Sequence, residues 1–432
     1  MIKIALKNLW ARRGNNIWLA IELVVVTIIA WLIIDPVAVR VYDTAQPLGY
    51  DRDRLVQLWF NTYDTLSTRY DRAASEKDIA GKHIADIRRS LEKLPQVERV
   101  TPTSQYYSPE SPSTNLTSFW STDTIQAMEG YYVPETGFFA TLGASSVEGS
   151  PTIAEIDDMH LGDGDIIVTE DIAKHLFPNG NAVGQILEGR DYYKPRRIVG
   201  VIGNVRLKGF TNTRFYTFSQ SNMFPVYYSG KVSENFSFLA RLRPGESTED
   251  FAEDESIRKE LRKGNYYCSS IKSLDALAKE EEKNRGVTGG KILGTCLLIF
   301  FMGSLMLGVT GIFWLQTRSR SHEAGIMKSF GASPRFITAT MMWEGVLLVL
   351  FTWAIGCLLY LQWGLNNGLA EKDRLIISKA SCPPDWVTDF PVHFAIISAI
   401  VLAVLLIVVC IGIYIPARRI SRVNPVDALR DE

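Results

Sequence analysis

Four long stretches with almost no charge constrain this sequence more than any other feature. Each contains at most one formally charged residue: Glu22 in 17–34, none in 292–317, Glu344 in 336–370, and none in 392–415, which has His393. A bilayer core about 30 Å thick is spanned by about 20 apolar residues in a helix. The average composition, with 47% hydrophobic residues and a net charge of -1, hides this segregation. We therefore expect four transmembrane helices.

A secretory signal peptide is the alternative interpretation of the first stretch, because Lys3, Lys7, Arg12 and Arg13 precede it. The apolar run is longer than a usual signal-peptide core, and no obvious small-x-small cleavage site lies before Asp43. We expect an uncleaved anchor.

Basic residues near the ends of the spans predict the orientation, because cationic flanks resist translocation. Residues 1–16 carry four basic residues and no acidic one, and residues 318–335 carry Arg318, Arg320, Lys328 and Arg335 against Glu323 alone. The tail from Pro416 is also basic, whereas the loop 364–391 is balanced. Both termini and the middle loop are therefore predicted to be cytoplasmic.

The predicted fold class is an α-helical membrane protein with a large α+β extracytoplasmic domain between its first and second helices. The expected segments are an amphipathic N-terminal helix 1–16, TM1 17–39, a two-lobed external domain 40–287, TM2 291–316, a cytoplasmic loop 317–335, TM3 336–362, an external loop 363–391, TM4 392–415, and a cytoplasmic tail 416–432.

The external domain shows strands alternating with amphipathic helices. We expect strands at 55–60, 96–100, 166–168, 197–205 and 238–242, and helices at 76–94, 170–176, 247–262 and 273–284. The first of these helices has Ile79, Ile84, Ile87 and Leu91 at helical spacing and ends at Pro95. About 245 residues are enough for a sizeable core.

Candidate chemistry in this domain is thin. Asp157, Asp158, His160, Asp163 and Asp165 are close in sequence but do not follow the spacing of a calcium loop, so a solvated turn is the favoured interpretation over a metal site. We predict no catalytic, cofactor or metal site. No basic patch favours nucleic acid.

Five cysteines do not indicate a disulfide framework. Cys268 and Cys382 are both predicted to lie outside the membrane and could pair, but one possible pair is weak evidence for a disulfide. A glycine-lysine sequence at Gly289 lacks the spacing of a phosphate-binding loop, so no means of binding ATP is visible in the chain.

Two carboxylates, Glu22 and Glu344, lie about two turns inside their spans. An ionised group in the bilayer is costly, on the order of 3 kcal/mol at its centre, and is usually functional. Because both are near a cytoplasmic end, we favour a structural or interface role over proton relay.

The loop HEAGIMKSFGASPRF, residues 322–336, interrupts the most hydrophobic region. It can form two helical turns, Gly331 can end them in the left-handed conformation, and Ser333 before Pro334 can begin the next helix. The alternative is an ordinary polar connector.

Residues 318–333 resemble the loop between the second and third membrane helices of MacB/FtsX-like ABC transporter permeases, which typically reads R-E-I-G-I-R-K-A-L-G-A-S. The matching residues are Glu323, Gly325, Ile326, Lys328, Gly331, Ala332 and Ser333. The chain departs from the pattern at His322, Ala324, Met327, Ser329 and Phe330.

The tail and the external domain carry the same resemblance. The tail matches the usual ending of this family at Pro416, Arg418, Arg419, Pro425, Val426, Ala428, Leu429 and Arg430. The run Met342-Trp-Glu-Gly with Glu344 resembles the start of its third helix, and segments such as 138–143 and 168–178 resemble its periplasmic core domain.

The resemblance implies a non-catalytic permease subunit in the inner membrane. Its partners would be an ABC ATP-binding subunit in trans, which binds ATP and Mg, and a second copy or a related permease. The middle loop would be the coupling helix. ATP-driven motion would reach the external domain by mechanotransmission and act on a peptide, drug, lipoprotein or cell-wall hydrolase. A periplasmic or outer-membrane partner and membrane lipid are further expected contacts, and nucleic acid is not.

Two other classes remain alternatives. A membrane-anchored sensor would bind an external ligand without ATP, but no cytoplasmic segment is long enough to be an output domain. A proton-driven carrier is disfavoured by four spans with only shallow carboxylates.

Overall fold

The structure is a computed structural model that describes residues 2–11, 13–103, 108–110, 116–120, 124–189, 194–209, 211, 213–220, 227–228, 231–232, 235–315, 324–370 and 382–421. The chain divides into two compact units. The helical unit comprises residues 1–42, 288–374 and 384–432, and the inserted domain comprises residues 43–287 and 375–383.

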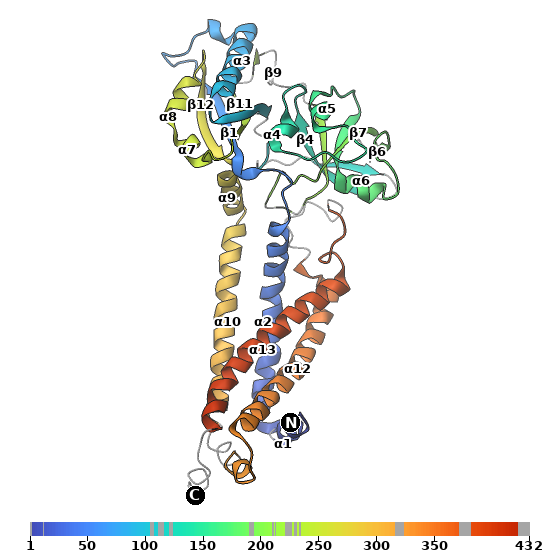
Figure 1. The fold of residues 1–432 in the computed structure, drawn as a ribbon, viewed down its shortest axis with the longest axis vertical. Coiled ribbons are helices and arrows are strands. Elements are labelled where there is room, and N and C mark those ends of the chain that lie inside the picture. The colour runs from blue at the N-terminus through green and yellow to red at the C-terminus, as the bar shows by residue number, and fades with distance from the viewer. Residues whose placement is uncertain are drawn as a thin grey trace. The chain divides into compact units, whose positions relative to one another are not determined.

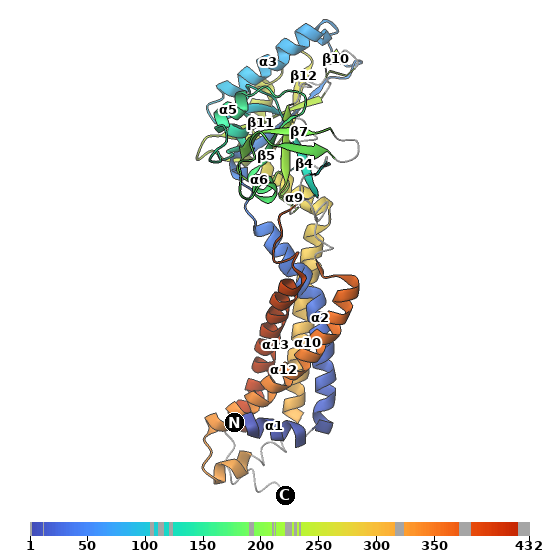
Figure 2. The ribbon, with the colours of Figure 1, turned by 90° about the vertical axis from the view of Figure 1, so that its right-hand side faces the viewer.

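Five helices of the helical unit are α1 (Ile2–Ala11), α2 (Arg13–Ala45), α10 (Val287–Leu315), α12 (Pro334–Asn367) and α13 (Phe390–Ile420) (Figures 1 and 2). The last four are long and apolar enough to cross a membrane. Two of them run through a proline, Pro36 in α2 and Pro416 in α13. A membrane helix tolerates the lost hydrogen bond where neighbouring groups compensate for it.

Close contacts at small or polar residues hold the long helices together. Along α12 and α13, the Trp353 indole N–H donates to the Ser398 carbonyl at 3.0 Å. Thr310 on α10 donates to the Gly412 carbonyl on α13 at 3.1 Å. Trp31 on α2 is fully buried and stacks on Tyr360 of α12 at 4.5 Å between ring centroids. Packing and hydrogen bonds replace the hydrophobic driving force that is missing between helices in lipid.

The first lobe of the inserted domain is a four-stranded antiparallel sheet in the order β12-β1-β11-β2. Its strands are β1 (Leu55–Thr62), β2 (Val97–Thr103), β11 (Asn235–Leu242) and β12 (Tyr266–Ser273). Alternate residues of β1, Val56, Leu58 and Phe60, share a buried cluster with the apolar face of α3 (Lys77–Lys93). The strand period of two thus directs one face of the sheet to the helix.

The helix expected at 247–262 is two short helices instead, α7 (Thr248–Glu253) and α8 (Glu255–Glu260). Asp254 lies between them, and its carboxylate accepts from the Ser256 backbone N–H at 2.7 Å. An aspartate that caps the following turn offers the backbone an alternative to helix continuation. By contrast, α6 (Glu170–Leu176) and α9 (Leu274–Asn284) lie where the pattern predicts helices.

The second lobe contains a closed barrel in the order β3-β4-β8-β5-β7-β6. Its strands are β3 (Leu116–Trp120), β4 (Thr124–Tyr132), β5 (Asp165–Thr169), β6 (Ile186–Gly189), β7 (Arg196–Ile202) and β8 (Tyr216–Gln220). The remaining short elements are η1 (Arg52–Arg54), η2 (Ala73–Ser75), α4 (Phe138–Leu142), α5 (Ile153–Asp158), β9 (Tyr227–Tyr228) and β10 (Lys231–Val232). A further buried cluster joins Leu55, Leu239 and Leu274 of the sheet lobe to Phe139 and Phe218 of the barrel lobe.

Gly356→Ala tests the packing of α12 against α2. A Cβ at Gly356 would lie 2.7 Å from Cβ of Thr27, and a β-branched side chain cannot rotate its own Cβ away. We expect a loss of about 1–3 kcal/mol in the free energy of unfolding, measured by denaturant titration in detergent. Gly303→Ala on α10 is the control, because no atom lies within 4 Å of its Cβ. Equal effects of the two variants would contradict this packing.

Candidate functional site

The loop between the second and third long helices contains a short helix that ends in a hydrogen-bonded cap. Residues 324–329 are helical and Gly331 has a φ of +87°. The Gly331 N–H donates to the Lys328 carbonyl at 2.9 Å, and the Ala332 N–H donates to the Met327 carbonyl at 3.0 Å. This pair of bonds is the Schellman arrangement, which requires the left-handed conformation that glycine adopts without strain. Residues 324–333, the described part of the loop, therefore form a defined turn rather than an open connector.

The next helix begins directly after this turn. The Ser333 hydroxyl accepts from the Phe336 N–H at 3.3 Å, and Pro334 occupies the first position of α12. A capped serine followed by proline is a favourable helix start, because proline lacks the N–H that would be unpaired there. Gly331 and Ser333 together set the angle between the short helix and α12.

The short helix has an inner and an outer side. Ala324 is only 3% exposed and packs in the core of the helical unit with Ile337 and Met341 of α12. Ile326 is 40% exposed and Phe330 is 88% exposed. We call Ile326 and Phe330 the exposed loop pair.

A second contact connects α1 to the same region. The Asn8 amide donates to Glu344 of α12 at 2.8 Å, and Glu344 is only 4% exposed. Asn8, Glu344, Ala324 and Met327 are among the residues that enclose a small gap of about 20 Å³. The N-terminal helix, the loop and the start of α12 thus meet around one buried carboxylate. Asn8 was not singled out from the sequence, because a lone asparagine gives no signal before its partner is known.

The other predicted site residues are placed as follows. Gly325 is buried, and Lys328 and Ala332 are partly buried. Glu22 on α2 lies against α10, where a Cβ at Gly308 would come within 2.6 Å of its carboxylate oxygen. Outside the described residues lie Glu323, Pro425, Val426, Ala428, Leu429 and Arg430.

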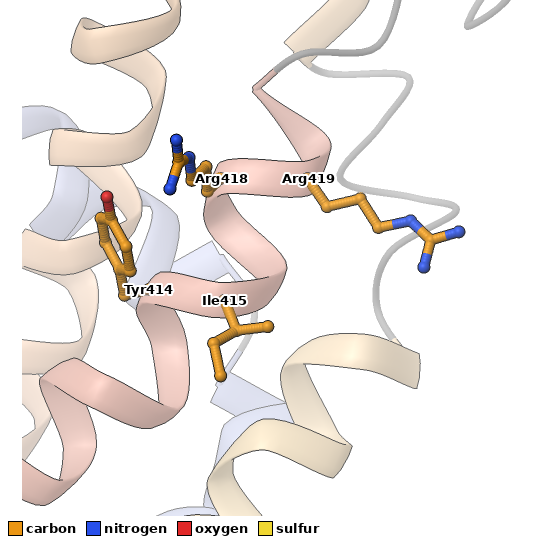
Figure 3. A pocket seen from close by; sticks show the side chains of 4 residues that line it. All are labelled: Tyr414, Ile415, Arg418 and Arg419. Carbon is orange, nitrogen blue, oxygen red and sulfur yellow. The ribbon is translucent and has the colours of Figure 1, made fainter.

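The end of α13 carries the described part of the tail motif. Tyr414, Ile415, Arg418 and Arg419 line an open cleft of about 420 Å³. Figure 3 shows Arg418 on the same side of the helix as Tyr414, with Arg419 extending the opposite way. The Arg419 guanidinium lies 4.7 Å from the ring of Trp314 on α10, a cation–π distance. Pro416 is buried inside the helix.

Within the inserted domain, a buried charged cluster joins the segment that follows α2 to α9. Arg52 lies 3.1 Å from Asp275 of α9 and 3.6 Å from Glu110. Glu110 is buried and accepts from the Tyr50 hydroxyl at 3.1 Å and from the Gly209 N–H. Burial raises the pKa of Glu110, an effect that the Gly209 N–H and Arg52 oppose.

Two basic side chains of the adjacent loop are buried in the same cluster. Arg206 donates to the Asp43 carbonyl, two residues before the end of α2. Lys208 is 3% exposed, and burial lowers its pKa to about 7, although Glu110 and Glu281 favour its charged form. Both sequence segments that lead to membrane helices are therefore tied to the core of the inserted domain. No motif marks this cluster, because its members are scattered over more than 200 residues of sequence.

The acidic residues between 157 and 165, considered above for metal binding, bond to different partners rather than to a common point. Asp157 accepts from the Phe139 and Ala140 N–H groups at the start of α4. Asp165 pairs with Arg197 at 2.9 Å, and His160 pairs with Glu135 at 3.1 Å. Among the described residues, no group of three or more potential ligands could hold a metal ion. Cys268 and Cys382, which could pair by their predicted location, form no disulfide in the described part of the chain.

Two family models match in the order that this architecture requires. The MacB-like periplasmic core domain matches residues 40–254, and the FtsX-like permease C-terminal model matches residues 295–425. The first match covers most of the inserted domain and the second covers α12 and α13. The chain belongs to the MacB/FtsX-like family of ABC transporter permeases.

Curated relatives of this permease are distant. It is 24% identical over 79% of its length to the macrolide export ATP-binding/permease protein MacB of a Shewanella species, and matches 48% of that protein. It is 26% identical over 68% of its length to a MacB protein of Yersinia pestis, and matches 42% of it. The permease therefore spans about half the length of these relatives, whose names include an ATP-binding part.

A structural comparison aligns 55% of the permease with 97% of the periplasmic region of MacB from Actinobacillus actinomycetemcomitans, at 15% identity and a TM-score of 0.30.

The four apolar helices and the family together make the chain a multi-pass protein of the bacterial inner membrane.

Asn8→Leu tests the contact between α1 and α12. The substitution leaves a buried carboxylate without one donor, which costs about 1–3 kcal/mol. We expect α1 to become susceptible to limited proteolysis in detergent, with cleavage fragments identified by mass spectrometry. Lys7→Leu is the control, because Lys7 is exposed on the same helix. Protection of α1 in both variants would show that the Asn8 contact does not hold it.

Lys208→Met tests the buried cluster through its pH dependence. An unfolded lysine binds its proton below about pH 10.4, whereas folded Lys208 binds it only below about 7. Between these values the unfolded state holds more protons, so stability rises with pH. We expect thermal unfolding of the full chain to show this rise, worth at least about 2 kcal/mol, and Lys208→Met to remove it. Lys279→Met is the control, because Lys279 is 77% exposed, and an unchanged slope in Lys208→Met would refute the assignment.

Proposed function

We propose that this permease couples ATP hydrolysis by a separate ATP-binding chain to motion of its inserted domain, which lies on the periplasmic side. The observation that carries the proposal is the loop turn at residues 324–333, with the exposed loop pair on its outer side. A turn that is fixed by hydrogen bonds and packed on α12 can pass a push from a docked partner directly to that helix. An open polar connector would absorb the motion.

The packing of the loop supports the same route. Ala324 and Met327 differ from the usual family residues, and both face the helical unit rather than the surface. Phe330 also differs, and it is the most exposed of the large apolar residues in the loop. We therefore propose that Phe330 contributes to the choice of ATP-binding partner, whereas Ala324 and Met327 fit the loop to α1 and α12.

The buried charged cluster supports the external end of the proposed route. Arg52, Arg206 and Asp275 connect the residues next to α2 and α10 to the centre of the inserted domain. Displacement of these connections would move the domain as a body, because separating Arg52 from the buried carboxylate of Glu110 would leave that carboxylate without its cation. This is the arrangement that mechanotransmission requires.

The remaining features are proposed from the family resemblance and, for the orientation, from the basic flanks of the spans. In this proposal the permease pairs with a second copy or a related permease, both termini lie in the cytoplasm, and ATP and Mg are bound by the partner chain. The substrate class is a peptide, drug, lipoprotein or cell-wall hydrolase at the outer face of the membrane. The macrolides named in the description of the MacB relatives are one example of such a drug. A sensor that works without ATP is the competing function.

Ile326→Asp and Phe330→Asp test the docking surface. Because both side chains are exposed, a charge there leaves folding intact but opposes an apolar contact. We expect an affinity-tagged full chain, purified from its native host, to retain a chain with Walker motifs, and each variant to retain at least about tenfold less. The partner is identified by mass spectrometry, and its ATPase activity is measured with the permease.

Leu66→Asp is the matched control, since Leu66 is a 93% exposed apolar residue of the inserted domain. Glu323→Lys and Gly331→Pro are expected to uncouple ATP hydrolysis from function while membrane insertion persists. Proline at 331 cannot adopt a φ of +87° and lacks the N–H that bonds to Lys328. If the wild type retains no ATP-binding chain, or if all loop variants retain it and function normally, the proposal fails and the sensor is favoured.

A further inference from the structure

A histidine and an aspartate are paired inside the helical unit, at the opposite end of α2 from the loop region. Asp35 of α2 and His393 of α13 are each 1% exposed in their side chains, and His393 Nε2 lies 2.6 Å from Asp35 Oδ1. The second oxygen of Asp35 accepts from the Ala370 N–H at 2.9 Å. The other ring nitrogen of His393, Nδ1, lies 3.0 Å from the Val387 carbonyl oxygen.

These partners determine how many protons the pair holds. A carbonyl oxygen only accepts, so Nδ1 must carry a proton. Nε2 faces a carboxylate oxygen, so a proton must also lie between those two atoms. A neutral ring beside an ionised aspartate has only one N–H. If it is on Nδ1, the lone pair of Nε2 faces Asp35 Oδ1, and if it is on Nε2, the lone pair of Nδ1 faces the Val387 carbonyl oxygen. The pair therefore holds one proton more than neutral histidine plus ionised aspartate, whether that proton is on the ring or on the carboxyl group, and its net charge is zero.

We propose that Asp35 and His393 form a proton-binding site that fastens α2 to α13 and to the segments on either side of the loop between α12 and α13. In the unprotonated pair, a buried negative charge would face a nitrogen lone pair, an arrangement that is strongly disfavoured away from water. Binding of the proton and closure of these contacts are therefore linked. This inference does not depend on the proposed coupling to ATP.

The surroundings show why the state of this pair matters for α2. Trp386 packs edge-on against the His393 ring at 5.3 Å between centroids, and Tyr42 packs edge-on against Trp386 at 5.2 Å. Val39, Ala370 and Val387 form a small buried cluster beside them. Asp35, Val39 and Tyr42, on successive turns of α2, are thus all held by the pair and its neighbours. The chain enters the inserted domain directly after these turns.

Other titratable groups on the surrounding elements have different roles. Asp385 accepts from the Val387 and Thr388 N–H groups, and Asp389 caps α13 by accepting from the Val392 N–H. Other titratable groups on the same helices include Arg40, Tyr42 and Asp43 on α2 and Cys357 and Tyr360 on α12. Residues 371–381, which include Glu371, Lys372, Asp373 and Arg374, lie outside the described part of the chain. The hydrogen bonds described for the pair's side chains come only from Ala370, Val387 and the pair itself.

Spectroscopy on the full chain in lipid bilayers tests the proton count directly. His393 is made the only histidine by replacing His83, His160, His175 and His322 with glutamine, and it is labelled with ¹⁵N. Infrared spectra of the same sample, with Asp35→Asn as the reference, report whether the Asp35 carboxyl group is protonated. We expect, at pH 6, either an imidazolium with an ionised carboxylate or a neutral ring with a protonated carboxyl group. A neutral ring beside an ionised carboxylate would overturn the proposal.

Hydrogen exchange of the Ala370 amide tests the fastening. After correction for intrinsic exchange, we expect protection in the wild type to fall roughly tenfold or more as the pH is raised, because the contacts close only with the proton bound. His393→Gln is expected to be poorly protected at every pH. The exchanged variant Asp35→His with His393→Asp, which keeps the two partners, is expected to regain part of the pH dependence.

His160→Gln is the matched control, because His160 makes the same kind of pair with Glu135 but is 64% exposed. It should leave the exchange profile of Ala370 unchanged. If the single variant at 393 does not insert, the wild-type profile against His160→Gln still decides the question. Protection that does not change with pH in the wild type would refute the linkage, whereas loss of ATP-binding chain capture would concern only the proposed function.

Discussion

Close helix packing without a hydrophobic driving force is the constraint on which the helical unit depends. Lipid is as apolar as a leucine side chain, so helices in a membrane associate through shape and polar contacts. Here a glycine on α12 accommodates Thr27 of α2, an indole N–H reaches the Ser398 carbonyl, and a threonine reaches the Gly412 carbonyl. Each contact needs a small or polar residue at one position, which makes the packing specific. The carboxylates of Glu344 and Asp35, each bonded to a residue of another helix, belong to the same set of contacts.

The two carboxylates of α2 and α12 that are buried with partners show how a membrane helix can keep an acidic group. Glu344 accepts from Asn8, and Asp35 is matched to His393 and a backbone N–H. In both cases the acidic group joins helices that are far apart in the sequence. One contact holds the N-terminal helix and the loop region, and the other holds the last turns of α2. These contacts fix α1 against α12 and α2 against α13, so that neighbouring helices can move together, as the proposed function requires.

Local patterns predicted a large part of this fold. The four long helices are visible in the sequence as uncharged stretches, because about 20 successive apolar residues are what a helix needs to cross a bilayer. The turn at Gly331 and the cap at Ser333 were predictable for a related reason: each depends on one residue and its near neighbours. The helices α3, α6 and α9 follow from their apolar spacing or capping residues. The helix expected at 247–262 was wrong because the capping bond of Asp254 outweighed the apolar pattern.

The sequence by itself determined the class of protein, since span count, basic flanks and the loop and tail motifs are all local properties of the chain. Only the tertiary structure decided the rest. The closed barrel pairs short strands that are distant in sequence, and no single strand carries the signal for closure. The cluster around Glu110 and the partners of Asp35 unite residues separated by scores to hundreds of positions. Such side chains gain their roles from the partners that folding brings to them, because burial and hydrogen bonding, rather than residue type, set the energy of a charged group.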